Sequence, residues 1–470
     1  MLEGLEISVI QKSEAFDQFF NARIDPEFFQ KYYTRLYKKI LSKKYELLGD
    51  IAFITDGEHG NAVTTEVGHS KYYGARNVLT GILSDNDVEY ISEEHHNKLR
   101  KSALIPRDVL ISCVGANVGF AAIVPDDIGI ANIVRNVALI RSHAGNFLNE
   151  YLQAYLSSSY GKNLYIRMNT GNAQPLVSLD YIKTVPVFKP TLELQKRIRD
   201  LTDLSLEALK KSKNLYSNAE QVLLEAVGLA DFKPSTQNTN IKTIAQSFGS
   251  SGRLDAEYYQ PKYEAFESTV KSNKYGYTFI KNEYDHFNDV SRKLKSAYHY
   301  IEISDVNVSD GTNSPILIET TELPANAKFE VKKGDLIISK VRPNRGAITV
   351  IEEEFDNLIV SGAFTVLREK PSSVFTKEVL KVLLRTPVYR EWMLQFNVGT
   401  QYPVIRDEDI LNLPIPKIDL TTQTNISQLV QQSFSLKAQS EHLLNVAKRA
   451  VEMAIEQDEA AAMAFITKSL

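Results

Sequence analysis

The sequence predicts an α+β protein made of two tandem-duplicated, β-rich αβ bodies. Each body is followed by a long helix, and the two helices are expected to pack as an antiparallel coiled coil. Two observations predict this class. Apolar and small residues alternate at spacings of four and three from Leu194 to Leu229, and a similar pattern returns from Ile426 to Ala454. Short motifs of the first half also recur, in the same order, in the second half.

The duplication is visible in several short stretches. Arg23-Ile-Asp-Pro-Glu-Phe-Phe-Gln recurs 230 residues later (253 − 23) as Arg253-Leu-Asp-Ala-Glu-Tyr-Tyr-Gln. The stretch 108–119 resembles 335–346 at an offset of 227 residues (335 − 108). Because the order is preserved and the offsets differ by only a few residues, we interpret the halves as a tandem duplication.

Each half is expected to contain the same elements in the same order. An amphipathic helix opens it, at 26–41 or 257–270. The clearest expected strands, rich in Val, Ile and Phe, are 108–114, 136–141, 335–341 and 364–368. A helix near 147–158 or 377–384, a polar loop, and a short strand at 185–187 or 413–415 complete each body.

The apolar and small residues of the two long helices are the expected helix-pair interface. Small residues at matched positions, such as Ser205 and Ser433, would let the two backbones approach closely. The predicted interface residues are Ile198, Leu201, Ser205, Leu215, Ile426, Leu429, Ser433 and Leu443. The alternative is two unrelated surface helices, each packed on its own domain.

These elements predict the following domain organisation. It comprises an N-terminal segment (1–22), a first body (23–190), a central long helix (191–230), a polar connector (231–252), a second body (253–417), and a C-terminal long helix with a tail (418–470).

Composition limits the classes of function. The chain has 470 residues, 43% hydrophobic, and a formal net charge of −4, so a nucleic-acid-binding protein of this kind must localise its positive charge or borrow it from a partner. Cys113 is the only cysteine, which excludes an internal disulfide and a cysteine-based metal cluster. With no signal-peptide pattern and no apolar run of membrane-spanning length, we expect a cytoplasmic protein without a membrane partner.

This pattern resembles the specificity (S) subunit of type I restriction–modification systems. The resemblance rests on the alternation of body and long helix, the opening motif at 253–259, and the helix start Leu192-Glu-Leu-Gln-Lys-Arg-Ile198. It extends from Leu5 to about Glu456, and the second helix starts differently, with Leu420-Thr-Thr-Gln-Thr-Asn-Ile426.

The resemblance implies a non-catalytic DNA-binding subunit. Each body would be a target-recognition domain for one half of a split double-stranded DNA sequence. The helix pair would set the spacer and dock two modification subunits, which bind S-adenosylmethionine and methylate adenine, and the assembly would recruit restriction subunits. No cofactor is expected on this chain.

Three loops in each half concentrate side chains suited to DNA. The first loop is 55–61 or 291–295, the second is 113–119 or 340–346, and the third is 169–175 or 397–403. The candidate contacts in or after these loops are His59, Asn61, Lys71, Tyr72, Arg76, Asn117, Asn172, Gln174, Arg292, Lys293, Lys295, Lys340, Arg342, Asn344, Arg345, Gln401 and Tyr402. For each, an ordinary turn or a solvated charge is the alternative.

The motifs of common enzymes are missing from the sequence. Neither Asn-Pro-Pro-Tyr nor Asp-Pro-Pro-Tyr, which mark adenine methyltransferases, occurs, and Gly-x-Gly-x-x-Gly is absent. His95 and His96 lack metal-ligand spacing and are interpreted as surface residues. Two other functions stay open: the specificity subunit of another restriction or methylation system, and a coiled-coil scaffold that binds proteins but not DNA.

Overall fold

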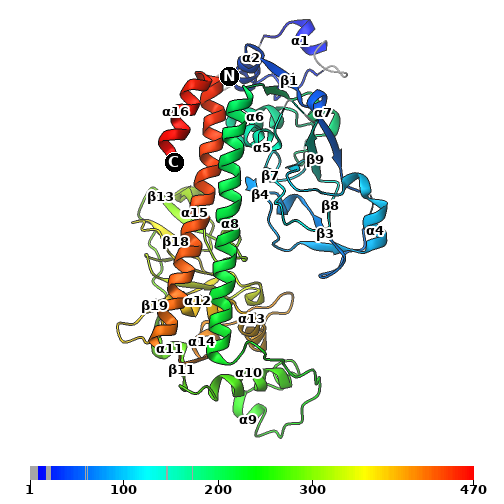
Figure 1. Cartoon of the computed structure of the whole chain (residues 1–470). Helices are drawn as coiled ribbons and strands as arrows, with labels where there is room; N and C mark the ends of the chain where they lie inside the picture. The colour runs from blue at the N-terminus through cyan, green and yellow to red at the C-terminus, as the bar shows by residue number, and fades with distance from the viewer. Residues whose placement is uncertain are drawn as a thin grey trace. The chain divides into compact units, whose positions relative to one another are not determined.

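The computed structural model describes residues 9–16, 23–58, 60, 62–143, 145, 147–171 and 173–470. The chain divides into two compact units. The first unit contains Met1–Lys210 and Lys437–Leu470, and the second contains Lys211–Leu436. The fold is mixed α+β (Figure 1). The long helices α8 (Leu192–Val227) and α15 (Leu420–Glu456) contribute residues to both units.

Within its described residues, the first unit has a short N-terminal helix followed by a body of short strands and helices. Its elements before α8 are α1 (Lys12–Phe16), α2 (Lys31–Leu41), β1 (Tyr45–Leu47), α3 (Leu48–Ile51), β2 (Ala52–Asp56), β3 (Ser70–Tyr73), η1 (Ala75–Asn77), β4 (Gly81–Ile82), β5 (Glu89–Ile91), α4 (Glu93–Lys98), η2 (Arg100–Ser102), β6 (Val109–Ser112), β7 (Ala121–Ile123), β8 (Ala131–Ile133), β9 (Val137–Ser142), α5 (Asn149–Ser157), α6 (Ser159–Arg167), α7 (Leu179–Lys183) and β10 (Pro186–Phe188).

Strand β6 is central to the first unit, in a sheet of order β2-β9-β6-β7-β4. All four of its residues are buried, which explains a run of apolar residues without polar alternation. Val109 and Ile111 belong to the core that contains Tyr151 of α5. Leu110, opposite Leu139 of β9, belongs to the core shared with the smaller sheet β5-β3-β8. The body is therefore layered as helices, larger sheet and smaller sheet.

The second unit contains a body with corresponding layers. Its elements before α15 are α9 (Phe248–Ser251), α10 (Pro261–Lys271), β11 (Tyr277–Phe279), α11 (Ile280–Glu283), β12 (Tyr284–Phe287), β13 (Ala297–Ile301), η3 (Ile303–Asp305), β14 (Ile316–Glu319), η4 (Thr320–Glu322), β15 (Ala327–Glu330), β16 (Leu336–Ser339), η5 (Pro343–Arg345), β17 (Ile348–Val350), β18 (Leu358–Ser361), β19 (Phe364–Glu369), α12 (Lys377–Arg385), α13 (Pro387–Met393), η6 (Leu394–Phe396), α14 (Asp407–Leu411) and β20 (Pro414–Pro416).

The central strand of the second unit is β16, in a sheet of order β12-β19-β16-β17. Leu336 and Ile338 belong to the core that contains Leu380 of α12. Ile337, opposite Val366 of β19, belongs to the core shared with Ile301 of the sheet β14-β13-β18-β15. The same alternation along the strand thus separates the helical layer from the second sheet in this unit as well.

Residues of α8 and α15 lie against each other in the first unit. Ile198 and Leu201 share one buried core with Leu443 and with the helices of the body. The Ser205 hydroxyl also hydrogen-bonds Ser440 at 2.8 Å between the two Oγ atoms. Because both hydroxyls are buried, this bond satisfies groups that would otherwise be desolvated without a partner.

The second unit contains a corresponding contact between the same two helices. Ala219 and Ile426 belong to its buried core. The Oγ atoms of Ser212 and Ser433 are 3.1 Å apart. Leu215 and Leu429, which the sequence analysis also assigned to the interface, are half-buried.

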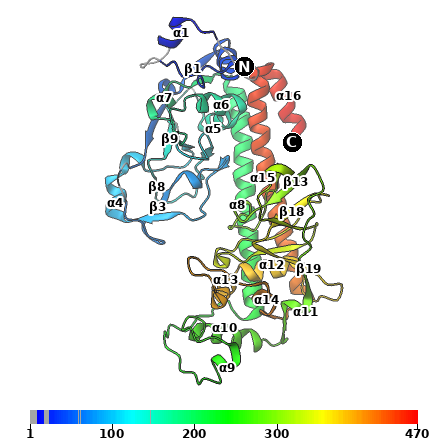
Figure 2. The ribbon, with the colours of Figure 1, turned by 180° about the vertical axis from the view of Figure 1, so that it is seen from behind.

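The C-terminal tail contains a helix that the sequence analysis did not single out. This helix, α16 (Glu459–Ser469), begins after Asp458, whose carboxylate accepts the Ala461 N–H at 2.8 Å as an N-cap. Glu459 accepts the N–H of Thr191, the residue before α8, at 3.0 Å. Figure 2 also shows α16 (red) beside α15 (orange), so the tail is a structural part of the first unit.

Within the described part of the chain, no helix combines the length and apolar character that a membrane crossing requires.

Candidate nucleic-acid interface

The second and third loops lie together in the second unit. The Arg342 N–H donates to the Pro403 carbonyl oxygen at 2.7 Å, and the Ile405 N–H donates to the Lys340 carbonyl oxygen at 3.0 Å. An isolated β-bridge joins Val341 to Val404. Two segments that are about 60 residues apart in the sequence therefore form one surface.

The second and third loops of the first unit are joined in the same way. The Gly115 N–H donates to the Pro175 carbonyl oxygen at 3.1 Å, and a bridge joins Val114 to Leu176. The repeat offsets align Gly115 with Arg342 and Gln174 with Tyr402. The same backbone arrangement thus holds different side chains in the two units.

Of the cations in the second loop of the second unit, Lys340 is neutralised by a carboxylate, whereas Arg342 and Arg345 are not paired in this way within the described residues. Lys340 forms an ion pair with Asp407 at 3.1 Å. Burial raises the pKa of Asp407, but hydrogen bonds from Thr365 and Lys340 outweigh it and hold this pKa below its usual value. Arg342 and Arg345 are exposed and have no carboxylate partner among the residues that the structure describes. These two guanidinium groups are available to an anionic or polar ligand.

An aromatic side chain accompanies one of these cations. The guanidinium carbon of Arg342 lies 5.6 Å from the centroid of the Tyr402 ring, within cation–π range. Tyr402 and Gln401 are exposed on the third loop. Asn344 is different, because its Oδ1 atom is buried and has no hydrogen-bond partner within the described residues. The structure thus turns this amide oxygen of Asn344 away from solvent.

In the first unit, the polar side chains of these loops are less available. Asn117 donates from Nδ2 to the Ala75 carbonyl oxygen at 3.2 Å, so its amide supports the fold of the body. Gln174 is exposed. Asn172 lies outside the described residues.

The cations that follow the first loop of the first unit are paired with carboxylates. Lys71 contacts Asp85 at 3.1 Å, and Arg76 contacts Glu89 at 3.0 Å. Tyr72 is buried, and burial, together with the charges of Glu58 and Glu89, raises its pKa to about 12. His59 and Asn61 lie outside the described residues.

The two histidines that the sequence analysis placed on the surface are half-buried and have partners. His95 Nε2 lies 2.5 Å from Glu58 Oε2, which connects α4 to the first loop. The His96 ring bonds to Asn132. Among the described residues, no group of His, Cys, Asp and Glu side chains has the arrangement of a metal site.

The first loop of the second unit keeps part of its positive charge exposed. Arg292 is exposed, and Lys293 has a positive φ of 51°. Lys295 donates from Nζ to the Asp356 carbonyl oxygen. This loop therefore presents Arg292 to solvent, while Lys295 is attached to the body.

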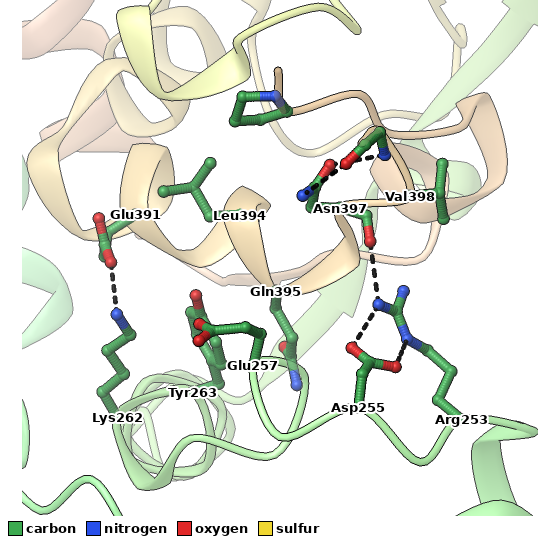
Figure 3. Close-up of a pocket in the computed structure, with 12 residues that line it drawn as sticks. Arg253, Asp255, Glu257, Lys262, Tyr263, Glu391, Leu394, Gln395, Asn397 and Val398 are labelled. Atoms are coloured by element: carbon green, nitrogen blue, oxygen red, sulfur yellow. Dashed lines mark hydrogen bonds and ion pairs between the residues drawn. The ribbon is translucent and has the colours of Figure 1, made fainter. Parts of the chain in front are cut away.

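A pocket of about 570 Å³ lies beneath the third loop of the second unit (Figure 3). The Arg253 guanidinium binds both oxygens of Asp255, at 2.8 and 2.6 Å, and donates to the Asn397 carbonyl oxygen at 2.9 Å. The Asn397 side chain accepts the N–H groups of Gly399 and Val404. The opening motif of the half thus holds the base of the third loop.

The opening motif has the same role in the first unit. Arg23 binds Asp25 at 2.8 and 2.6 Å and donates to the Asn169 carbonyl oxygen at 2.9 Å. Asn169 accepts the Gly171 and Leu176 N–H groups. In the sequence, these motifs are recognisable only as repeats. The motif recurs at an offset of 230 residues (253 − 23) and the third loop at 228 (397 − 169), and these nearly equal offsets were the signal that could have connected them.

The glutamine of each long-helix start is buried. Gln195 accepts the Leu148 N–H at 2.9 Å, just before α5. Gln423 accepts the Thr376 N–H at 3.1 Å, just before α12, and donates to the carbonyl oxygens of Val374 and Ile418. The residues around Gln195 and Gln423 differ, but each glutamine accepts a backbone N–H just before a helix of its body.

Two curated proteins match part of the chain, and both are specificity subunits of type I restriction enzymes. No family model matches the chain. The chain is 28% identical over 152 residues to the type I restriction enzyme HindI specificity subunit of Haemophilus influenzae, covering 30% of this chain and 33% of that protein. It is 25% identical over 157 residues to the EcoDI specificity subunit of Escherichia coli, covering 32% and 34%. The chain thus matches about a third of the length of these curated relatives.

Solved structures with low similarity were also found. An S subunit of a type I restriction–modification system from M. genitalium has a TM-score of 0.36 at 10% identity, covering 91% of this chain and 96% of that one. The HsdS subunit of Thermoanaerobacter tengcongensis has a TM-score of 0.29 at 14% identity, covering 88% and 97%. The names of the two curated relatives agree with the resemblance stated from the sequence.

Proposed function

We propose that this chain is the DNA-sequence-specificity subunit of a type I restriction–modification complex. Each body recognises one half of a bipartite target in double-stranded DNA. One observation carries the proposal: the second and third loops are joined by the same backbone hydrogen bond in both units, from Gly115 to Pro175 and from Arg342 to Pro403. One loop frame with different side chains is what recognition of two different half-sites requires.

The proposal includes a tandem duplication and an antiparallel coiled coil of α8 and α15. The repeated motifs support the duplication, and so do the matching ion pairs of Arg23 with Asp25 and Arg253 with Asp255. The serine pair of each unit supports helix pairing. A rigid helix pair then sets the number of base pairs between the half-sites, as the separation of recognition elements does in dimeric DNA-binding proteins.

The chain acts through partners in this proposal. With a net charge of −4, it binds DNA weakly alone. Two modification subunits, which carry S-adenosylmethionine, dock on the helix pair and add phosphate contacts, and restriction subunits join the complex. The chain itself is non-catalytic, and the domain boundaries are those expected from the sequence.

Methylome sequencing tests the proposal. A host that carries this chain with its modification partner is compared with a host that carries the partner alone. We expect a new split adenine-methylation motif, and exchange of residues 253–417 with those of a relative changes one half of it. An active partner complex without a new motif would instead favour a protein-binding scaffold.

A further inference from the structure

The backbone of the second loop turns through a left-handed conformation at the same position in both units. Gly115 has a φ of +89° and Arg342 a φ of +48°. At each position the N–H donates to a carbonyl oxygen of the third loop, from Pro175 or Pro403. The turn needs a positive φ, which glycine adopts freely, and the first unit has glycine there.

Arginine at this turn has a conformational cost. A non-glycine residue in the left-handed region is destabilised, because its Cβ atom lies too close to the following carbonyl oxygen. The Arg342 side chain does not offset this cost with an ion pair in the described part of the chain, and it is exposed. Strain of this kind is typical of binding sites, where the side chain is needed for contact with a ligand.

The surroundings of Arg342 restrict its orientation. Pro343 follows it and is buried, and the Tyr402 ring lies 5.6 Å from the guanidinium carbon. The arginine therefore projects from a fixed backbone beside an aromatic ring, rather than from a mobile chain end. A directional contact with a planar group fits this arrangement better than a diffuse contact with a phosphate.

We propose that Arg342 recognises a guanine in the DNA half-site bound by the second unit. This inference rests on the proposed function and identifies a specificity-determining residue within it. Arginine donates two hydrogen bonds to O6 and N7 of guanine in the major groove. Tyr402 positions the guanidinium. The first unit has no side chain at the matched Gly115, so the corresponding contact is missing from its half-site.

The test uses the full chain in its complex with the modification subunits. The wild-type motif is first determined by methylome sequencing, and exchange of residues 253–417 shows which half belongs to the second unit. Duplexes with each base pair of the motif replaced singly are then compared for complex binding. The variants are Arg342→Gly and Arg342→Asn, because both residues tolerate a positive φ.

We expect the wild-type complex to discriminate about 10- to 100-fold against replacement of one G·C pair in that half-site. Both variants reduce this ratio to near one and leave the ratios at all other pairs unchanged. Arg345→Gly, in the same turn, is the control for loss of charge: it weakens binding to all duplexes alike and keeps the ratio, because a phosphate contact carries no base information. Tyr402→Phe also keeps it, whereas Tyr402→Leu lowers it because the ring is lost.

Either of two results would overturn the inference. Discrimination at every guanine stays at the wild-type level in both Arg342 variants, or binding weakens equally for all duplexes, as loss of a phosphate contact predicts. Failure of the proposed function is distinct, because the wild-type complex then produces no split motif at all.

Discussion

The hydroxyl of Ser205 on α8 lies 2.8 Å from the hydroxyl of Ser440 on α15 and donates to the Ser440 carbonyl oxygen at 3.0 Å. In the second unit, the Ser433 hydroxyl donates to the Ser212 carbonyl oxygen at 2.8 Å. The offset of 228 residues (433 − 205) aligns Ser205 with Ser433 and Ser212 with Ser440, so the two pairs are counterparts. Buried polar pairs of this kind favour one register of a helix pair over shifted ones.

A larger side chain at this contact is expected to destabilise the first unit. Ser205→Leu places apolar volume where the helices are in close contact and leaves the Ser440 hydroxyl unpaired, which costs about 1–3 kcal/mol. Urea denaturation measures the loss. Leu204→Ala, at an exposed neighbouring position, is the control and changes stability by less than about 0.5 kcal/mol. Equal stability of Ser205→Leu and wild type would contradict close packing here.

Lys381 makes the stability of the second unit depend on pH. Burial lowers its pKa from 10.5 to about 7, and its Nζ lies 4.0 Å from the centroid of the Phe434 ring. The unfolded chain therefore binds one more proton than the folded chain between about pH 7 and 10.5, and this residue's contribution to stability rises with pH across that range.

The variant Lys381→Met removes this titration. We expect it to be more stable than wild type by a few kcal/mol (about 2–4) below pH 7, because no charge is then buried. The difference shrinks as pH rises toward 10. Denaturation curves of both proteins between pH 6 and 10 measure it, and a constant difference would show that Lys381 does not titrate in this range.

The buried glutamine of the second helix start is expected to be required for stability. Gln423→Leu leaves the Thr376 N–H and two carbonyl oxygens without their partner, a cost of about 2–4 kcal/mol. Gln431→Leu, on an exposed position of the same helix, is the matched control. Thermal denaturation compares the two. Similar melting temperatures would mean that the glutamine contacts contribute little.

An ion pair inside each body gives a further prediction. Asp335 is buried and binds Arg368 through two contacts of 2.7 Å, as Asp108 binds Arg141 in the first unit. Arg368→Met leaves a buried carboxylate without its cation and destabilises the second unit by about 3–5 kcal/mol. Denaturant unfolding measures the change, with Arg292→Met as the exposed control. A loss no larger than that of the control would contradict the prediction.

Arg345 is expected to contact a phosphate, since it is exposed and has no ion pair in the described residues. In the complex with modification subunits, Arg345→Ala weakens binding to specific and non-specific duplexes alike. The slope of log affinity against log salt falls in magnitude by about 0.9, the value for one phosphate contact. Titrations at several salt concentrations give this slope. An unchanged slope would exclude the contact.

Several elements of each half could be predicted from the spacing of apolar residues alone. The expected helix at 377–384 is α12 (Lys377–Arg385), and the expected strand at 364–368 is β19 (Phe364–Glu369). Both agree closely because their apolar spacing is a local property of neighbouring residues, which share one face of a helix or strand. The tail helix α16 was missed because its run of alanines has no clear apolar face.

Which candidate side chains are available depends on contacts between distant parts of the chain. Lys71, Lys340 and Arg342 are all candidate cations in the sequence. Lys71 and Lys340 are neutralised by Asp85 and Asp407, whereas Arg342 has no carboxylate partner in the described part of the chain. The Asn397 carbonyl is held by Arg253, 144 residues earlier in the chain. Ion pairs and hydrogen bonds over such separations depend on how sheets and loops pack in space, and no local spacing in the sequence encodes that distance.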